Sequence, residues 1–210
     1  MIKILIADDH AIVREGLKQI LSESPDLVVV AEASSGQEVL EKISKNDLDL
    51  VVLDIAMPGR GGLDILKEIK TQKPRLPVLM LSMYPEEQYA IRVLKSGASG
   101  YLTKESAPSE LVMAIRQISQ GKKYISPSLA EKLAIDLELS PDKLPHEILS
   151  DREYQVMCMI ASGKTLKEIA DGLSLSIKTI STYRSRILEK MNMKTNAELT
   201  HYAIKSNLVD

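Results

Sequence analysis

Short apolar runs alternate with longer amphipathic stretches over residues 1–120 of the chain. The clearest run, Leu50 to Leu53, is apolar at every position, which is typical of a strand buried on both faces in a parallel sheet. Similar runs recur along this part of the chain. We expect strands at Ile2–Ala7, Leu27–Ala31, Leu50–Leu53, Pro77–Leu81 and Ser99–Leu102.

The stretches between these runs have the spacing of helices that bury one face. Val13, Leu17 and Ile20 follow the pattern i, i+4, i+7, and the stretch from Leu111 to Ile118 repeats it. Strands that alternate with helices form βαβ units with right-handed crossovers. The pattern therefore predicts an α/β domain over residues 1–120, with a doubly wound parallel five-stranded sheet between two layers of helices.

Polar residues with related chemistry follow several of the predicted strands. Carboxyl ends of parallel strands meet at one edge of the sheet, where α/β proteins bind ligands. Three carboxylates at that edge would repel one another unless a cation neutralises them, and a few hard oxygen ligands favour Mg²⁺. A lysine and a hydroxyl opposite the metal would complete a site for a phosphoryl group. The residues are Asp8, Asp9, Asp54, Ser82 and Lys104.

Simpler interpretations of these residues remain open at this point. A lone Asp54 before Pro58 and Gly59 would be a turn residue or a helix cap, and the whole set would be unrelated polar loop residues. The three histidines are scattered along the chain, so no Cys/His cluster indicates zinc.

Composition and charge narrow the class of protein. No apolar run approaches the ~20 residues of a membrane span, and the N-terminus does not resemble a signal peptide. The single cysteine, Cys158, suits a reducing compartment, so we expect a cytoplasmic protein without membrane contact. The net charge of −2 is nearly neutral, but the chain is slightly basic from Ile148 onward and acidic before it, which hints at different partners for the two parts.

The first part resembles the receiver domain of two-component response regulators. The resemblance rests on the runs Ile4–His10, Leu53–Pro58 and Gly97–Lys104, together with Ser82. It implies a flavodoxin-like strand order of 2-1-3-4-5. It also implies that Asp54 accepts phosphate from a sensor histidine kinase.

The same resemblance implies roles for the other residues at this edge. Asp9 would bind Mg²⁺ directly, Asp8 through water, and Ala56 through its backbone carbonyl, beside Asp54. Ser82 would bond the phosphoryl group, Lys104 would pair with its charge, and Tyr101 would turn inward with Ser82. His10 is either a phosphocarrier or a helix-start residue, and we favour the helix start.

Residues 121–146 are expected to form a linker with a helix. Leu129, Leu133 and Leu137 have helical spacing, and Pro141 and Pro145 follow them. The second domain would then occupy residues 147–210.

That second domain has only helical patterns. Three capping boxes open apolar periodic runs, at Ser150 with Glu153, Thr165 with Glu168, and Thr195 with Glu198. A short helix from Leu166, a tight Ser174–Ser176 connection and a longer helix from Ile177 have the form of a helix-turn-helix unit.

Projection of the longer helix separates an apolar arc from a polar one. The apolar arc consists of Ile177, Ile180, Ile187, Leu188 and Met191. Lys178, Ser181, Thr182 and Ser185 lie opposite, and Thr179 and Arg186 lie at the edge. Such a short, weakly basic face fits the major groove of DNA, although a solvated helix face has the same pattern. Arg184 falls within the apolar arc, so it either reaches a phosphate or pairs with an acid inside the domain.

The second part resembles the four-helix output domain of the LuxR/NarL/FixJ family. The runs Leu149–Glu153, Lys167–Ala170 and Ser176–Arg184 carry the resemblance, and Tyr124–Pro127 with Glu198–Thr200 place the chain nearest the GacA/UvrY/BvgA kind. It implies binding to double-stranded promoter DNA as a homodimer formed on phosphorylation, with the last helix, around Leu199, Tyr202 and Ala203, at the subunit contact. We expect Lys178, Ser181, Thr182 and Ser185 to read bases and Lys164, Thr179 and Arg186 to hold phosphates.

The combined pattern predicts a phosphorylation-switched transcription factor and not an enzyme. A Mg²⁺-dependent phosphatase with an aspartyl nucleophile shares the acidic residues but leaves the helix-turn-helix unexplained. A receiver that switches without phosphate is the other alternative, and the complete set of Asp8, Asp9, Asp54, Ser82 and Lys104 argues against it.

Overall fold

The computed structural model describes residues 1–126, 129–131 and 144–209, and the chain divides into two compact units, Met1–Glu131 and Lys132–Asp210. The helix expected through Leu129, Leu133 and Leu137 lies for the most part outside the described residues. Within the described part of the chain, no helix is long and apolar enough to cross a membrane.

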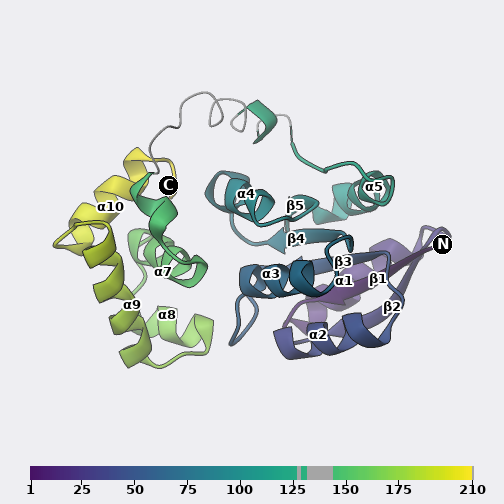
Figure 1. The fold of residues 1–210 in the computed structure, drawn as a ribbon, viewed down its shortest axis with the longest axis horizontal. Helices are drawn as coiled ribbons and strands as arrows, with labels where there is room; N and C mark the ends of the chain where they lie inside the picture. Colours follow the sequence, from purple (N-terminus) through teal and green to yellow (C-terminus); the bar gives the residue numbers. More distant parts are fainter. Residues whose placement is uncertain (127–128, 132–143, 210) are drawn as a thin grey trace. The chain divides into compact units, whose positions relative to one another are not determined.

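The first unit contains the five parallel strands that the sequence predicts (Figure 1). Their order in the sheet is β2-β1-β3-β4-β5, which confirms the expected flavodoxin-like topology. The strands are β1 (Ile2–Ala7), β2 (Leu27–Ala33), β3 (Leu50–Asp54), β4 (Val78–Ser82) and β5 (Gly100–Thr103).

Helices cover both faces of this sheet. α1 and α5 pack together on one face, and α2 and α3 pack together on the other, with α4 beside β5 (Figure 1). Alternate residues of each buried strand serve the two faces, so Ile4 and Ile6 join the core beneath α1 and α5. The helices are α1 (Ala11–Ser22), α2 (Gly36–Lys45), α3 (Gly62–Gln72), α4 (Glu86–Lys95) and α5 (Ala107–Ser119).

The second unit is helical throughout its described residues. A 3₁₀ turn, η1 (Pro145–Ile148), precedes α7 (Asp151–Ala161), α8 (Leu166–Leu173), α9 (Ile177–Lys190) and α10 (Asn196–Lys205). α7 packs against α9 and α10, and α8 packs against α9. Ile169 of α8 and Ile180 and Ile187 of α9 are fully buried in this unit.

Local signals set the helix boundaries in this unit. Ser150 and Thr165 each form a complete capping box, as predicted. The third box is incomplete, because Glu198 accepts the backbone N–H of Lys194 instead of that of Thr195. Ser174 has a φ of 53° and ends α8, and the Ser176 hydroxyl accepts the Thr179 N–H at the start of α9. The helix-turn-helix is therefore present where the sequence predicts it.

Candidate functional site

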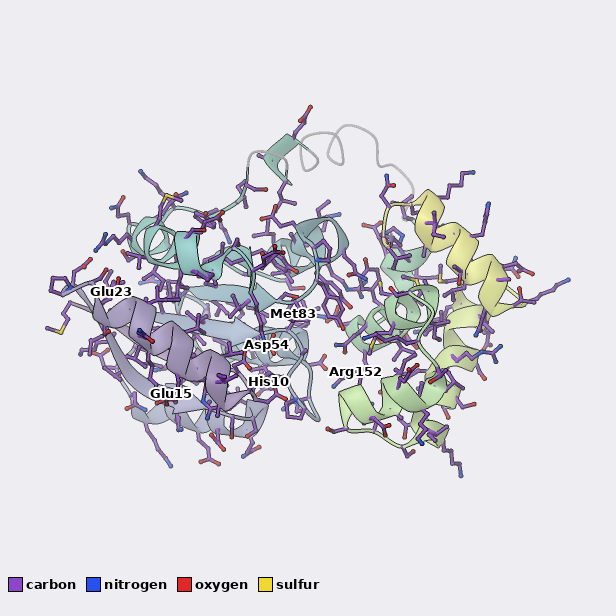
Figure 2. The ribbon with its side chains drawn as sticks, turned by 180° about the vertical axis from the view of Figure 1, so that it is seen from behind. His10, Glu15, Glu23, Asp54, Met83 and Arg152 are labelled. Atoms are coloured by element: carbon purple, nitrogen blue, oxygen red, sulfur yellow. The ribbon has the colours of Figure 1, made fainter. Side chains whose placement is uncertain are left out.

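Strand pairing brings four predicted residues together at the carboxyl edge of the sheet. β1 pairs with β3 so that Ala7 lies opposite Leu53, which makes Asp8 and Asp54 neighbours. β4 pairs with β5 so that Ser82 lies opposite Thr103, and the Lys104 N–H donates to the Ser82 carbonyl at 2.6 Å. Figure 2 shows Asp54 and His10 at the same end of this unit, away from Glu23 at the far end of α1.

One lysine faces two buried carboxylates at this edge. Lys104 Nζ lies 2.7 Å from Asp8 Oδ2 and 3.1 Å from Asp54 Oδ2, and both acids are fully buried. Burial raises the pKa of Asp54 to about 6, with Lys104 opposing that rise and Asp8 adding to it. Burial alone would lower the pKa of Lys104, but the charges of Asp54 and Asp8 raise it instead.

The carboxylates retain unused capacity to bind a cation. Among the described residues, Asp8 Oδ2 and both carboxylate oxygens of Asp54 are buried without a hydrogen-bond donor. The contact with Lys104 is therefore an ion pair by distance that lacks hydrogen-bond geometry. Ligand atoms of Asp8, Asp9, His10 and Asp54 all lie within 4.8 Å of one another. Two buried carboxylates that share one ammonium carry an excess of negative charge, and hard oxygen donors suit Mg²⁺. The residues present fit that ion, with Ala56 two residues beyond β3.

His10 lies at the start of α1, as the favoured interpretation predicts. Its Nδ1 lies 3.2 Å from Asp8 Oδ1 and 2.8 Å from Asp9 Oδ1, and its backbone N–H donates to Asp8 Oδ1 at 2.8 Å. The sequence analysis did not predict that the imidazole contacts both carboxylates, because a histidine at a helix start gives no indication of where its ring points.

Ser82 and Tyr101 connect the acidic site to the loop after β4. Ser82 is fully buried, and its Oγ accepts the Tyr84 N–H at 3.0 Å. Tyr101 is also fully buried, and its hydroxyl donates to the Tyr84 carbonyl at 2.7 Å. Burial raises the pKa of Tyr101, so its hydroxyl remains a donor. The structure thus places Tyr101 in the inward position.

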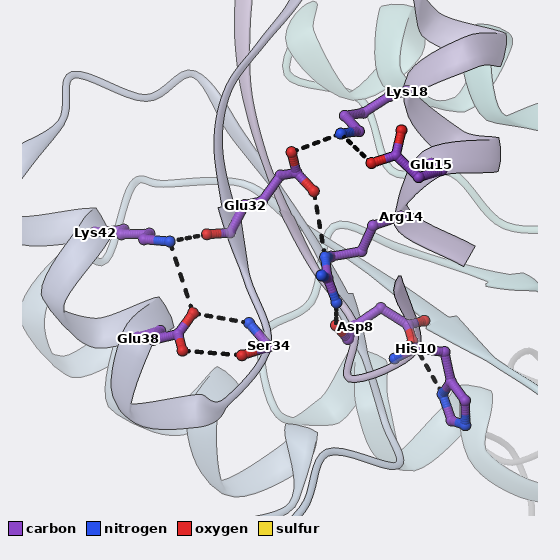
Figure 3. Close-up of polar contacts among 9 residues, drawn as sticks. All are labelled: Asp8, His10, Arg14, Glu15, Lys18, Glu32, Ser34, Glu38 and Lys42. Atoms are coloured by element: carbon purple, nitrogen blue, oxygen red, sulfur yellow. Dashed lines mark hydrogen bonds and ion pairs between the residues drawn. The ribbon is translucent and has the colours of Figure 1, made fainter. Parts of the chain in front are cut away.

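Arg14 of α1 fixes the loop that carries Asp8, and sequence reasoning missed it. Its Nη1 donates to the Asp8 carbonyl at 2.8 Å, and its Nε donates to Glu32 of β2 at 3.2 Å (Figure 3). Lys18 Nζ binds the other oxygen of Glu32 at 2.8 Å. The pKa of Glu32 is lowered because the Lys18 hydrogen bond and the Arg14 bond outweigh burial. Glu32 is 18 residues from Arg14 in sequence, so only the packing of α1 against β2 reveals the network.

Gly62 is a second residue that the sequence did not indicate. A Cβ at this position would lie 2.1 Å from the Asp54 carbonyl oxygen and 2.8 Å from Ile55 Cα. Its N–H donates to the Ile55 carbonyl at 2.9 Å. Glycine at the start of α3 therefore lets the helix approach the backbone of Asp54.

The predicted DNA-reading residues of α9 lie on an accessible face. Thr179 is half-buried, and the remaining predicted contacts are exposed, namely Lys178, Ser181, Thr182, Ser185, Arg186 and Lys164. Two of the hydroxyls bond within the helix, Thr182 to the Lys178 carbonyl at 3.0 Å and Ser185 to the Ser181 carbonyl at 3.1 Å. A base contact would compete with these local bonds.

Three predictions about this unit need correction or refinement. Ile177 is 51% exposed instead of inward, because it is the first residue of α9 and no preceding turn covers it. Arg184 has no acid partner among the described residues, because its Nε donates to the Asn196 side-chain oxygen at 2.6 Å, and a contact of its guanidinium with a phosphate stays a prediction. Leu199 and Ala203 are buried in the unit and Tyr202 is half-buried, so the predicted subunit contact of this helix would involve its more exposed side chains and stays a prediction.

Comparison with known proteins agrees with both halves of this arrangement. The model of the response regulator receiver domain matches residues 4–116, and that of the bacterial regulatory proteins of the luxR family matches residues 147–203. The chain belongs to the two-component response regulators that join a receiver domain to a luxR-type helix-turn-helix domain. Receiver domains use Mg²⁺ at an acidic pocket of the kind that Asp8, Asp9 and Asp54 form.

Individual relatives are similar over nearly the whole chain. Response regulator UvrY of Escherichia coli K12 is 39% identical over 210 residues, which cover 99% of this chain and 96% of that protein. Response regulator GacA of Pseudomonas syringae pv. syringae B728a is 38% identical over 211 residues, covering 100% and 99%. The structure of RcsB from Salmonella enterica serovar Typhimurium, bound to promoter rprA with the phosphomimetic BeF₃⁻, matches with a TM-score of 0.65 and 28% identity over 96% and 98%. These similarities confirm the expected NarL/FixJ family.

Proposed function

We propose that Asp54 is the phosphoacceptor of this response regulator and that its phosphorylation switches DNA binding by the second domain. The observation that carries this proposal is the pair of buried, unbonded oxygens on Asp54 beside Lys104. A carboxylate attacks phosphorus readily when positive charge neutralises the incoming group. Lys104 supplies one such charge. Mg²⁺ held by Asp8, Asp9, Asp54 and the Ala56 carbonyl would supply the rest.

The other residues of the edge act after transfer. An acyl phosphate adds negative charge and acceptor oxygens where Asp54 stands. Ser82 would turn its hydroxyl from the Tyr84 N–H toward the phosphoryl group, and Lys104 would follow the new charge. Tyr101 would respond to a movement of this loop, because its hydroxyl donates to the Tyr84 carbonyl. The loop after β4 would therefore adopt different arrangements in the phosphorylated and unphosphorylated chains.

The partners follow from this assignment. A sensor histidine kinase would donate the phosphate, and a homodimer of phosphorylated chains would bind promoter DNA through α9. Residues 1–120, 121–146 and 147–210 would serve as receiver, linker and DNA-binding domain. The protein would act in the cytoplasm and would not turn over a separate substrate. The RcsB complex with promoter and BeF₃⁻ supports the link between phosphorylation and DNA in a relative.

Labelling with a small phosphodonor in Mg²⁺ tests the proposal. The wild-type chain should take up label to one phosphate per chain, and the variant Asp54→Asn should take up none. Asp64→Asn, which changes a carboxylate in the first turn of α3, is the matched control and should label normally. Undiminished label on Asp54→Asn would overturn the assignment. Continuous release of phosphate from a phosphate ester would favour the phosphatase, and full operator binding without phosphate would favour the phosphate-independent receiver.

A further inference from the structure

A surface cavity of about 460 Å³ lies in the receiver unit at the amino ends of β4 and β5, the edge of the sheet opposite Asp54. The C-terminal parts of α3, α4 and α5 border it together with the loops that lead into the two strands. Five cationic residues line it, namely Lys70, Arg75, Lys95, Lys122 and Lys123. They come from different segments, so the folded chain gathers a concentration of positive charge that no single stretch of sequence displays.

This charge is not balanced within the cavity. Among the described residues that line it, none is an acid. Lys70, Arg75, Lys122 and Lys123 also have no carboxylate within ion-pair distance in the described part of the chain. Surface lysines elsewhere on this unit do pair, as Lys18 does with Glu15 and Glu32. The cavity therefore differs from an ordinary mixed-charge surface.

Backbone contacts hold two of the lysines in place. Lys70 Nζ donates to the Leu76 carbonyl at 2.6 Å, and Lys123 Nζ donates to the Ala98 carbonyl. Each ammonium has three protons, so one carbonyl leaves it further donors. Burial lowers the pKa of Lys70, with the charge of Lys123 adding to the effect, and burial lowers the pKa of Lys123 as well. The fold thus holds two like charges near each other, and an anion between them would relieve that cost.

We propose that this cavity binds a small polyphosphate, a ligand with two or more linked phosphate groups. Its volume falls within the range of about 300–1,000 Å³ that is usual for small-molecule sites. The cations come from α3, from the α3–β4 loop and from the segment after α5, so a ligand with linked phosphate groups offers more anionic oxygens to them than a single phosphate does. Pro74, Pro77 and Ile118 supply an apolar wall, which accommodates an organic group attached to the phosphates. The site is separate from the phosphoacceptor and does not depend on it.

Occupation of the cavity would act on the segment where the chain leaves the receiver. Tyr124 forms a parallel bridge with Gly100 of β5, and its N–H donates to the Ser99 carbonyl at 2.9 Å. Lys122 and Lys123 immediately precede it. A polyphosphate bound by these lysines and Arg75 would tie this exit segment to the loop before β4, and would make its amides slower to exchange.

Isothermal titration calorimetry on the full chain tests the proposal, with EDTA present so that no metal bridges the ligand to Asp8 and Asp54. The probes are sodium pyrophosphate and tripolyphosphate, compared with orthophosphate and sulfate at constant ionic strength. We expect one pyrophosphate per chain with a Kd below about 1 mM, and at least tenfold weaker binding of orthophosphate and sulfate. A Kd that is equal for all four anions, or no binding of pyrophosphate, would overturn the proposal.

Charge-neutralising variants locate the binding. Arg75→Gln and Lys122→Gln should each weaken pyrophosphate binding about fivefold, because each removes one close charge pair. Both side chains are exposed, so these variants are expected to fold. Lys45→Gln, at the end of α2 and outside the cavity, is the matched control and should change the Kd less than twofold. If Lys45→Gln weakened pyrophosphate binding equally, the effect would be one of general charge, and the cavity would be refuted as the binding site.

Two further measurements separate this site from other functions of the chain. Asp54→Asn should bind pyrophosphate as the wild-type chain does, even if the phosphoacceptor assignment fails. Loss of binding in Asp54→Asn would place the ligand at the acidic edge and refute the cavity. A loss of operator affinity in Arg75→Gln and Lys122→Gln without any pyrophosphate binding would make the basic surface a DNA contact instead, and would also refute it.

Discussion

At the scale of a single residue, Asp54 combines a fully buried position with a charged side chain. Its strand is apolar up to Leu53 and buried throughout, yet it ends in a carboxylate whose two oxygens have no hydrogen-bond donor among the described residues. Burial of such a group costs stability, and Lys104 offsets that cost only in part, since the pKa of Asp54 is still raised. Nearby residues that make no contact with a ligand, Arg14 and Gly62, nevertheless fix the backbone around the two acids. The geometry of the site therefore depends on residues outside the reacting set.

Two glycine-to-alanine variants, one at the site and one control, test how tightly that backbone is held. Gly62→Ala places a Cβ against the Asp54 carbonyl, so α3 or the strand end must shift, and we expect a loss of about 1–3 kcal/mol in the free energy of unfolding. Gly16→Ala is the control, because it lies inside α1 with no heavy atom within 4 Å of the added Cβ, and it should stabilise by about 0.5–1 kcal/mol. Urea denaturation followed by circular dichroism measures both. A Gly62→Ala chain as stable as the wild type would refute the constraint.

At the scale of the element, Glu153 joins two helices of the second unit. Its carboxylate accepts the Ser150 N–H at 2.8 Å at the start of α7 and the Lys190 ammonium at 2.7 Å from α9. Burial alone would raise the pKa of Glu153, but Lys190 and the Ser150 bonds outweigh it, and the pKa is lowered. The pKa of Glu153 is lower in the folded chain than in the unfolded chain. Its contribution to the free energy of unfolding is therefore fully present above the unfolded pKa and is lost as the pH falls through the folded pKa.

The second unit should therefore lose stability in acid through this residue. We expect the free energy of unfolding of the wild-type chain to fall between pH 6 and pH 3, with about 1–2 kcal/mol of the loss due to Glu153. Glu153→Gln should be less stable near pH 6 and should show a flatter pH dependence, with the two curves meeting in acid. Urea denaturation across that range measures this. Parallel curves for the two proteins would contradict the assignment.

Helix α9 carries two kinds of predicted DNA contact. Lys178 lies on the polar stripe opposite Ile180 and Ile187, and Arg186 lies at its edge, and both are exposed. Lys178→Ala should cost roughly 1–3 kcal/mol on the operator and little on a scrambled duplex. Arg186→Ala should weaken both duplexes alike and flatten the salt dependence by about one unit. Fluorescence anisotropy at two salt concentrations, on an operator identified by genome-wide binding, separates the roles. Equal loss on both duplexes for Lys178→Ala would place it among the phosphate contacts.

Much of this could be predicted from the sequence, because apolar periodicity and strand-end chemistry are local signals. The five strands and the helix-turn-helix follow from such signals, and so does the meeting of Asp54 with Lys104. Ile177 was misassigned because a projection assumes a complete helix, whereas the first turn has no cover. Arg184 bonds Asn196 and not an acid, because the first residue of α10 meets α9 only in the folded unit. The basic cavity is invisible in sequence because four segments contribute to it.

At the scale of the whole molecule, two compact units follow one another along the chain, and each contains its own site. Phosphate would add charge at the edge of the first unit, while the predicted DNA contacts belong to the second. Residues 117–146 join the two matched family segments. The prolines predicted to punctuate this linker do not favour a rigid rod. The switch is therefore better explained by which surfaces become free than by a motion passed along the linker.

Phosphorylation is accordingly expected to act by dimerisation together with release of the second domain. Light scattering with and without beryllofluoride in Mg²⁺ should show the mass rise from the monomer value of 23.3 kDa to about twice that value. Release and dimerisation are separable on DNA, because release raises affinity for an isolated half-site, whereas dimerisation raises it only for the full operator. Asp54→Asn lacks the carboxylate that holds beryllofluoride and should respond in neither assay. An unchanged mass together with unchanged affinity for both duplexes would rule out this mechanism, and a mass increase without any gain on the operator would disconnect dimerisation from DNA binding.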